Sequence, residues 1–538
     1  MPGSQFQTDC GIPIKAVYGP GDIADLDERR DLGDPGTPPY TRGAYPNMYR
    51  DRLWRIFQLS GYGSAEDERE RIKYLLDHGE TGFIMETDIS TWYPYDIDHP
   101  EVLARKEDVG AFGAPLMSLK DYEAALEGIP IGEVYCHPGG VTPQQGVFSN
   151  ACYFALAEKR GIPWSQLAGT GESDMMISYL GHLRKDYIPP EHALRLNCDL
   201  IEFVVQNLPR WVPLSIAGYN CRENGVNACQ ELAMVMANAI AYIEEILGRG
   251  KLKIDDFAHG IAGVNFAVGR DFFESICQMR AARRMWYKLM TERYHTDSPR
   301  SVRLRIHSLM QGSDYTYEQP MNNIIRGTYH ALSAVLGGAQ SMGVPAYDEA
   351  ISIPSEGAQV ISLRTQQIIQ HESNITSVVD PLAGSYYVEW LTKEIERKAW
   401  EHLEEIERLG GYVAVLNSGW ALKEALKGAY ERERQTLSGE RKVVGSNCFR
   451  VEEEYHHTPA FRPNPKTWEI SMERLRRLRQ ERDGAAVKEV LGEVRRVAQS
   501  GENVMPTMLR AAKAYVTIGE IGQIWREVFG TWHVPSAF

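Results

Sequence analysis

Residues 82–96 read GFIMETDISTWYPYD, and the pattern of this stretch decides the fold. A short apolar run, 82–85, begins at a glycine and leads directly into two acids, Glu86 and Asp88. An apolar run of this length, bounded in this way, predicts a buried strand. Because buried carboxylates are costly unless they are paired or functional, the acids suggest that this strand ends at a functional site.

The same alternation of short apolar segments and helical stretches continues from about residue 50 to 400. Further strands are predicted at 132–137, 214–220 and 302–310, with amphipathic helices such as 229–247 and 271–290 between them. This order favours a parallel sheet and, at this length, a closed (β/α)8 TIM barrel in an α/β fold. A doubly wound open sheet is the main alternative, although no G-x-G-x-x-G motif follows a strand.

The predicted organisation has four parts. An N-terminal arm rich in Gly, Pro and Asp (1–40) precedes the barrel domain (41–410), a helix and proline-containing linker (411–468) and a C-terminal helical extension (469–538). Around the linker, helices are predicted at 386–409, 420–437, 471–499 and 505–529.

Composition excludes several functional classes. Apolar residues make up 43% of the 538 residues and charged ones 24%, as in globular proteins. The net charge of -14 argues against non-specific nucleic-acid binding. The eight cysteines include no C-x-x-C pair, so neither a zinc knuckle nor a redox motif is indicated. With no signal peptide and no apolar run near the roughly 20 residues that cross a bilayer, we expect a cytoplasmic protein without membrane contact.

Several stretches, in order, resemble the methylmalonyl-CoA mutase family of adenosylcobalamin-dependent acyl-CoA mutases. They are TRGAYPNMYRDRLWRIFQLSGYG (41–63), SIAGYNCRENG (215–225), NNIIRGTYHALSAVLGGAQSMGVPAYDEAISIP (322–354), VVDPLAGSYYVEWLT (378–392) and the tail 503–530. The resemblance implies an isomerase whose barrel holds the acyl-CoA along its axis, with cobalamin at one end. There an adenosyl radical starts the rearrangement of the carbon skeleton, while the protein orients and shields the reacting groups.

The family's cobalt-binding D-x-H-x-x-G motif is absent from this sequence. The resemblance therefore implies the large subunit of a split mutase, with no cobalamin-binding domain and no metal ligand of its own. A separate small subunit would ligate the cobalt of adenosylcobalamin, which makes the enzyme a hetero-oligomer. A G-protein chaperone is a further expected partner.

The resemblance also assigns candidate binding residues. Those expected to bind the acyl-CoA are Tyr45, Met48, Arg52, Thr170, Glu172 and Arg210; those expected to bind the cofactor are Thr87, Glu223, His307, Glu349 and Ala350. An arginine suits phosphate because its planar fork makes paired hydrogen bonds, and a carboxylate accepts well from ribose hydroxyls. Each of these side chains could equally be an ordinary surface or core group.

Several pocket positions depart from the family pattern. Asn220 replaces a histidine that binds the thioester carbonyl, and Glu172 and Leu309 each replace a glutamine. Gly260 stands where an arginine is expected, and the arginine that pairs with a substrate carboxylate falls on Leu183 or Arg184. These changes leave open a different substrate or a loss of activity.

Two departures point to the substrate. Leu59 replaces the tyrosine that covers the migrating group, and Glu86 replaces a small apolar residue. In the branch that acts on 2-hydroxyisobutyryl-CoA, the same positions resemble an isoleucine and a hydroxyl-binding aspartate. We therefore assign Glu86, Asn220 and Leu59 to the catalytic centre of a hydroxyacyl-CoA mutase of the 2-hydroxyisobutyryl-CoA or 3-hydroxybutyryl-CoA type. The alternatives are a mutase for an unhydroxylated branched acyl-CoA or methylmalonyl-CoA, and a non-catalytic CoA-binding paralogue. Asp88 matches a residue that the family shares, and we expect it to be structural.

Overall fold

The fold was taken from a computed structural model that describes residues 6–182, 186–451 and 460–536. Its strands form two parallel five-stranded sheets. One sheet has the order β2 (Leu59–Ser60), β3 (Gly82–Met85), β4 (Tyr135–His137), β5 (Gly169–Thr170) and β6 (Trp211–Val212). The other has the order β1 (Arg55–Ile56), β10 (Ser341–Gly343), β9 (Arg305–Met310), β8 (Gly263–Val268) and β7 (Ile216–Ala217).

The chain passes from one sheet to the other in two places. β1 leads through 57–58 into β2, and β6 leads through 213–215 into β7. Each of these strands lies at the edge of its sheet, so both edges of one sheet continue directly into the edges of the other. Among the described residues no ladder of hydrogen bonds joins the two sheets, and a closed barrel is therefore not formed by strand pairing alone.

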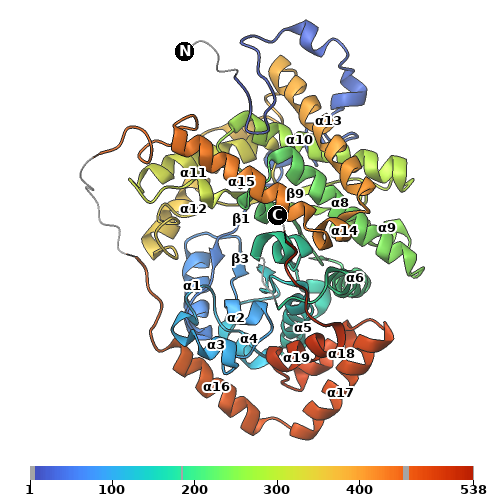
Figure 1. Ribbon diagram of the computed structural model, residues 1–538, viewed down its shortest axis with the longest axis vertical. Helices are drawn as coiled ribbons and strands as arrows, with labels where there is room; N and C mark the ends of the chain where they lie inside the picture. The colour runs from blue at the N-terminus through green and yellow to red at the C-terminus, as the bar shows by residue number, and fades with distance from the viewer. Residues whose placement is uncertain (1–5, 183–185, 452–459, 537–538) are drawn as a thin grey trace.

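Helices follow most strands and lie around the sheets (Figure 1). In the first two thirds of the chain they are α1 (Ala65–Asp77), α2 (Ile89–Trp92), α3 (Pro100–Leu103), α4 (Leu119–Ala125), α5 (Pro143–Lys159), α6 (Pro190–Asn207), α7 (Gly218–Glu223), α8 (Ala228–Gly248), α9 (Ile254–Ile261), α10 (Phe272–Lys288), α11 (Asn322–Gly337) and α12 (Glu356–His371). α5, α10 and α8 are the most deeply buried of these helices, since most of their side chains are covered by neighbouring elements. Within the described segments, no helix is long and apolar enough to cross a membrane.

The predicted strand 214–220 is wrong at its end. Only Ile216–Ala217 is extended, and Gly218–Glu223 forms α7 instead. The turn into the helix is permitted by Gly218, because a β-carbon there would lie 2.9 Å from both Glu231 and Val235 of α8. Asn220 therefore lies on a helix and not at the end of a strand.

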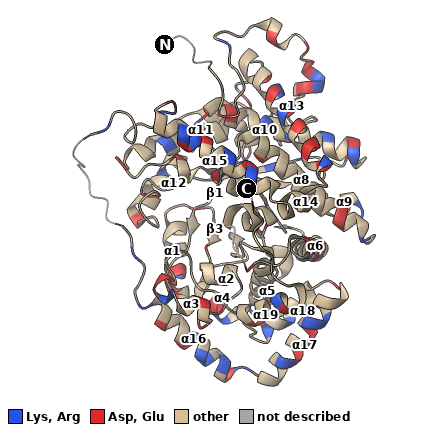
Figure 2. Cartoon of the chain, viewed as in Figure 1, with Lys and Arg blue, Asp and Glu red and all other residues tan. Residues whose placement is uncertain are grey.

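The C-terminal third contains α13 (Tyr386–Arg408), α14 (Tyr412–Asn417), α15 (Trp420–Ser438), α16 (Thr467–Glu481), α17 (Gly484–Ser500), α18 (Met505–Lys513) and α19 (Ile518–Phe529). The two helices predicted for the tail are each divided in two. Asp483 caps α17 through the Ala485 and Ala486 amides, and the capping box of Thr517 and Glu520 starts α19. α16 to α19 lie at the opposite end of the molecule from the N-terminal arm (Figure 1). Acidic and basic residues both occur on α13, α16 and α17 (Figure 2).

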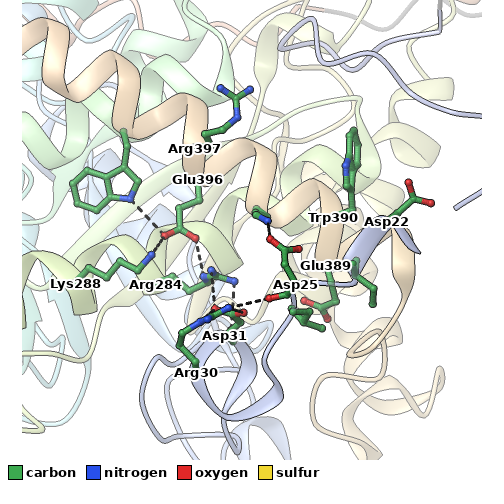
Figure 3. A pocket seen from close by; sticks show the side chains of 14 residues that line it. Asp22, Asp25, Arg30, Asp31, Arg284, Lys288, Glu389, Trp390, Glu396 and Arg397 are labelled. Atoms are coloured by element: carbon green, nitrogen blue, oxygen red, sulfur yellow. Dashed lines mark hydrogen bonds and ion pairs between the residues drawn. The ribbon is translucent and has the colours of Figure 1, made fainter. Parts of the chain in front are cut away.

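The N-terminal arm folds back on the protein and contains two short helical turns, Pro20–Ile23 and Glu28–Leu32, instead of being extended throughout. Between residues 22–31 of the arm and helices α10 and α13 lies a cavity of about 810 Å³, called here the arm cavity. Its charges are paired: Glu396 accepts from Lys288 at 2.6 Å and lies 2.7 Å from Arg284, which also reaches Asp31 at 3.6 Å (Figure 3). The two ion pairs of Glu396 join α13 to α10, and the Arg284–Asp31 pair joins the arm to α10.

Candidate functional site

A second cavity, of about 740 Å³, lies between the two sheets and is called here the central cavity. Eight strands contribute to its lining, together with residues that follow β1, β5 and β6, and both sheets are represented. Since all the strands are parallel, the cavity has an amino end and a carboxyl end. Arg55 and Arg305 lie beside Tyr135 at the amino end, whereas His137 and Glu172 lie at the carboxyl ends of β4 and β5.

Glu86 directly follows β3, just beyond the residues that line the central cavity. Gly61 packs against it so closely that a β-carbon on Gly61 would lie 2.5 Å from that of Glu86, which only glycine allows. In the segments that the structure describes, no hydrogen-bond partner reaches the Glu86 carboxyl group. Burial, and then the neighbouring Glu172 carboxylate, raise the pKa of Glu86 to about 8. The Glu86 charge in turn raises the pKa of the buried Glu68 carboxyl, after the larger effect of burial.

Asp88, the second acid of the opening stretch, has a structural environment. Its carboxylate accepts hydrogen bonds from the Ser90 amide, the Ser90 hydroxyl and the Gly110 amide at 2.9, 2.5 and 2.8 Å. It thereby caps the short helix α2. Of the two acids at the strand exit, only Glu86 keeps its hydrogen-bonding capacity free for a ligand.

Leu59 lies next to Glu86 across the sheet. β2 pairs with β3 so that Leu59 faces Ile84, which lines the central cavity. Glu86 is two residues beyond Ile84, and Leu59 and Glu86 are therefore diagonal neighbours on one face. Leu59 is 52% exposed although it belongs to a strand, so its side chain borders open space at the carboxyl end.

Glu172 and His137 occupy the adjoining strands. Glu172 accepts from the Asn265 amide at 2.7 Å, a hydrogen bond that links the two sheets. Its other oxygen lies 3.7 Å from the His137 Nε2 atom. Burial, with a smaller contribution from the Asp174 charge, raises the pKa of Glu172 to about 7, and burial lowers that of His137 to about 4. Near pH 7, His137 is consequently neutral, whereas Glu172 is about half ionised.

His307 lies on β9, on the other side of the cavity, where its Nδ1 atom is 2.8 Å from the Ser341 hydroxyl. Its ring is 5.9 Å from that of Phe57. Burial, followed by the proximity of His137, lowers the pKa of His307 to about 4. His307, predicted as a cofactor-binding residue, therefore lies in the same cavity as Glu172 and Thr170.

The amino end of the cavity is cationic. Arg55 lies over the Tyr135 ring, 4.4 Å from its centroid, and Arg303 lies 5.0 Å from the ring centroid of Tyr45. Burial and the nearby Arg52 charge both lower the pKa of Arg55. Two of the predicted acyl-CoA residues, Tyr45 and Arg52, thus join arginines that suit a phosphate-bearing ligand.

Two predicted cofactor residues, Glu223 and Glu349, come together around Tyr219. A β-carbon on Gly312 would lie 3.4 Å from a Glu349 oxygen and 3.8 Å from the Tyr219 hydroxyl, so the glycine leaves a small cradle between them. Glu223 accepts from the Ser313 amide at 3.2 Å, while its other oxygen is buried without a hydrogen-bond partner. Two carboxylates with free acceptor capacity fit the hydroxyl groups of a ribose. Ala350 follows Glu349 in the same exposed turn.

Three other predicted residues lie elsewhere. Met48 is buried and lines a separate small cavity with Arg283 and Gly338. Arg210 is exposed. Among the described residues, its guanidinium donates a hydrogen bond only to the Gln166 carbonyl oxygen, at 3.4 Å. The Thr87 hydroxyl accepts from Trp92 and Gln145 at 3.1 and 2.9 Å, which occupies its acceptor capacity.

The remaining departures are not at the cavity wall. The Asn220 side chain packs against Gly181, and Asn220 is not among the lining residues. Gly260 lies on α9, where a β-carbon would meet Val205 and Pro213, so this position offers no room for an arginine. Leu309 packs against Gly343. Leu183 and Arg184 lie outside the described residues.

Comparison of the sequence with those of known proteins identifies the family. The sequence profile of the methylmalonyl-CoA mutase family matches residues 7–531. The chain belongs to the methylmalonyl-CoA mutase family. It is 39% identical over 536 residues to the 2-hydroxyisobutanoyl-CoA mutase large subunit of Aquincola tertiaricarbonis, a match that covers 99% of this chain and 94% of the relative. It is 36% identical to the methylmalonyl-CoA mutase of Cereibacter sphaeroides, over 97% of this chain and 72% of that protein.

A third relative, the methylmalonyl-CoA mutase large subunit of Streptomyces virginiae, is 33% identical over 98% of this chain and 71% of its own length. CoA mutases are isomerases, and this chain is one of that class. Within the described segments, no group of three or more His, Cys, Asp or Glu side chains is arranged to hold a metal ion.

The sequence motifs of this mutase did not reveal His137, Arg55 or Arg305 as cavity residues, or Asn265 as the hydrogen-bond donor to Glu172. His137 had a usable signal, because it ends a predicted strand (132–137) just as Glu86 ends 82–86. Arg55 and Arg305 begin their strands, and nothing in their local sequence shows that their side chains face one cavity.

Proposed function

We propose that this chain is the large, substrate-binding subunit of an adenosylcobalamin-dependent mutase that rearranges the carbon skeleton of a hydroxyacyl-CoA. The expected substrate is of the 2-hydroxyisobutyryl-CoA or 3-hydroxybutyryl-CoA type. The observation that carries the proposal is the free carboxyl group of Glu86 beside the apolar Leu59. A hydroxyl group donates to such a carboxyl group, and a site built for that bond rejects analogues that lack the hydroxyl.

The two sheets are, in this proposal, the halves of one (β/α)8 TIM barrel around the central cavity. Two features support this arrangement. Residues of both sheets line one cavity, and the hydrogen bond from Asn265 to Glu172 connects them across it. Both edges of each sheet also continue directly into the other sheet along the chain.

The polarity of the cavity sets the direction of the substrate. Arg55 and Arg305 at the amino end suit the phosphates and polar chain of CoA, with Tyr45 and Arg52 beside them. The acyl group would then reach the carboxyl end, where Glu86, His137 and Glu172 are shielded from bulk water. Barrel enzymes place their chemistry at this end.

Glu223 and Glu349 would hold the adenosyl ribose, with the cradle at Gly312 leaving room for it. When bound, adenosylcobalamin supplies the radical that starts the rearrangement. We assign the cobalt ligand to a separate small subunit, in a hetero-oligomeric complex assembled in the cytoplasm, with a G-protein chaperone as an accessory partner. The name of the Aquincola relative, a large subunit, supports this division.

The test is direct. The purified chain is mixed with the cobalamin-binding small subunit, adenosylcobalamin and candidate CoA esters, and isomer formation is measured by liquid chromatography. We expect conversion of 2-hydroxyisobutyryl-CoA or 3-hydroxybutyryl-CoA. Conversion of succinyl-CoA but not of hydroxyacyl esters would overturn the substrate assignment.

A second candidate is an unhydroxylated branched acyl-CoA, favoured by the apolar, exposed side chain of Leu59. Conversion of isobutyryl-CoA in preference to its 2-hydroxy derivative would establish it. Absence of turnover with every ester would instead identify a non-catalytic paralogue.

A further inference from the structure

His137 is a buried histidine whose side chain is left unpaired by the part of the chain that the structure describes. It is 4% exposed, and neither ring nitrogen has a hydrogen-bond partner among those residues. It lines the central cavity at the carboxyl end of β4, level with Ile84 of β3. Most buried polar groups are paired, and an unpaired one that faces a cavity indicates a ligand.

The surroundings of His137 define the chemistry of that ligand. The nearest charged group is Glu172, whose carboxylate oxygen is 3.7 Å from the His137 Nε2 atom, beyond hydrogen-bonding distance. Glu172 itself is held in place by Asn265. Glu86 follows β3, on the opposite side of β4 from Glu172, and the two acids are close enough that, after the larger effect of burial, the Glu172 charge raises the pKa of Glu86. The site therefore offers one imidazole donor next to two carboxyl acceptors.

Only some acyl groups satisfy both kinds of partner. A hydroxyl group accepts one hydrogen bond and donates another, so it can use the imidazole and a carboxyl group together. A hydrogen atom or methyl group in its place uses neither. A second carboxylate, as in a dicarboxylic acyl group, would meet two further acids, Glu86 and Glu172, instead of a cationic partner.

We propose that His137 is a second specificity-determining residue, which donates its ring N–H to the hydroxyl oxygen of the acyl group while that hydroxyl donates to Glu86. This inference rests on the proposed function and adds a residue to its site. Because burial keeps His137 neutral at pH 7, one ring N–H is always present and the bond carries no charge of its own. Glu172 lies 3.7 Å from the Nε2 atom without a hydrogen bond to it, so the ring N–H stays available to the acyl group.

The experiment compares two esters that differ only in the hydroxyl group. 2-Hydroxyisobutyryl-CoA and isobutyryl-CoA are titrated calorimetrically into the full chain, and the ratio of their dissociation constants is the readout. We expect the wild type to prefer the hydroxy ester by about 100-fold, as two buried hydrogen bonds imply. His137→Phe should reduce that preference by about tenfold, and His137→Gln, which keeps a donor, should fall between the two.

His330→Phe is the matched control. His330 is also fully buried, has no hydrogen bond at either ring nitrogen and lies 3.9 Å from a carboxylate, that of Asp314. It does not line the central cavity, so its replacement should leave the ratio unchanged in the folded protein. Circular dichroism confirms that each variant is folded before titration.

The outcomes separate the two proposals. A wild-type ratio near one overturns the hydroxyacyl substrate class and the role of His137 with it. A strong wild-type preference that falls in Glu86→Gln but persists in His137→Phe overturns the role of His137 alone. A loss of preference in His137→Phe but not in His330→Phe supports the inference.

Discussion

The arm cavity and the central cavity are both lined by charged and polar side chains, but only in the arm cavity are the charges paired. In the arm cavity, Glu396 has Lys288 and Arg284 within 2.7 Å. In the central cavity, His137 has no hydrogen bond and Glu86 has no partner among the described residues. The paired charges of Glu396 stabilise the packing of α13 against α10. The unpaired polar groups of the central cavity raise the free energy of the empty site and are available to a ligand.

The comparison teaches that a large charged cavity is not by itself an active site. The arm cavity is the larger of the two, at about 810 Å³ against about 740 Å³. Its ion pairs, drawn as dashed lines in Figure 3, nevertheless join protein side chains to one another. Four predictions, made on three substitutions, test this contrast.

The largest effect is expected for Glu396→Ala in the arm cavity. Removal of this carboxylate leaves Lys288 and the buried Arg284 without their main partner, and we expect the free energy of unfolding to fall by about 3 kcal/mol. Chemical denaturation measures the loss. Turnover per folded molecule should be retained, because the residue lies outside the central cavity. Lys393→Ala, which removes an exposed ion pair with Asp25, is the matched control and should not change stability measurably.

The next effect is expected for Glu86→Gln, which changes function instead of stability. Loss of the carboxylate acceptor should lower kcat/KM for the hydroxyacyl-CoA by about 100-fold, or ~2.7 kcal/mol of transition-state stabilisation. The assay is the reconstituted turnover described above. Unchanged turnover in a folded Glu86→Gln protein would show that Glu86 does not contact the substrate.

A smaller effect concerns the pH dependence of stability. The pKa of Glu86 is raised to about 8, so between pH 4.5 and 8 the unfolded chain loses this proton while the native chain keeps it. Stability from this group is therefore lost as the pH rises through that window. Glu86→Gln removes the loss and should be more stable than wild type by about 1–2 kcal/mol at pH 8, but not at pH 4.5. A stability difference that does not depend on pH would contradict the raised pKa.

The smallest effect is expected for Glu172→Gln. Its charge helps to raise the pKa of Glu86, and its loss should lower that pKa by less than about one unit. Glu68, the other acid that interacts with Glu86, remains in place. If the ionised Glu86 binds the hydroxyl, the rise of turnover with pH should move to lower pH in this variant. A pH–rate profile checks the direction, and a move to higher pH would show that Glu172 acts in another way.

Much of the fold could be predicted from the sequence because it depends on local patterns. The apolar run 82–85 is β3, and the predicted helix 229–247 is α8, Ala228–Gly248. The tail was less predictable. A continuous helical pattern hides the breaks at Asp483 and Thr517, where capping side chains compete successfully with helix continuation.

The candidate site was predicted only in part. Glu86, Glu172, Thr170 and His307 come from motifs, and the structure places them around or beside one cavity. Asn220 did not follow its motif, since a helix turn at Gly218 directs it toward Gly181. His137 was missed although it ends a predicted strand, because the sequence of β4 does not show which side chains of other strands lie beside it.

By itself, the sequence indicated the family, several of the strands and helices, and the acid at the end of β3. These follow from motifs and from periodicities that lie within a few residues of each other. Only the tertiary structure decided which charges are paired. Glu396 meets Lys288 across 108 positions of the chain, and Glu172 meets Asn265 across 93. Pairing depends on how distant segments pack in space. Whether a buried polar side chain has a partner in the protein or is available to a ligand is therefore a property of the fold.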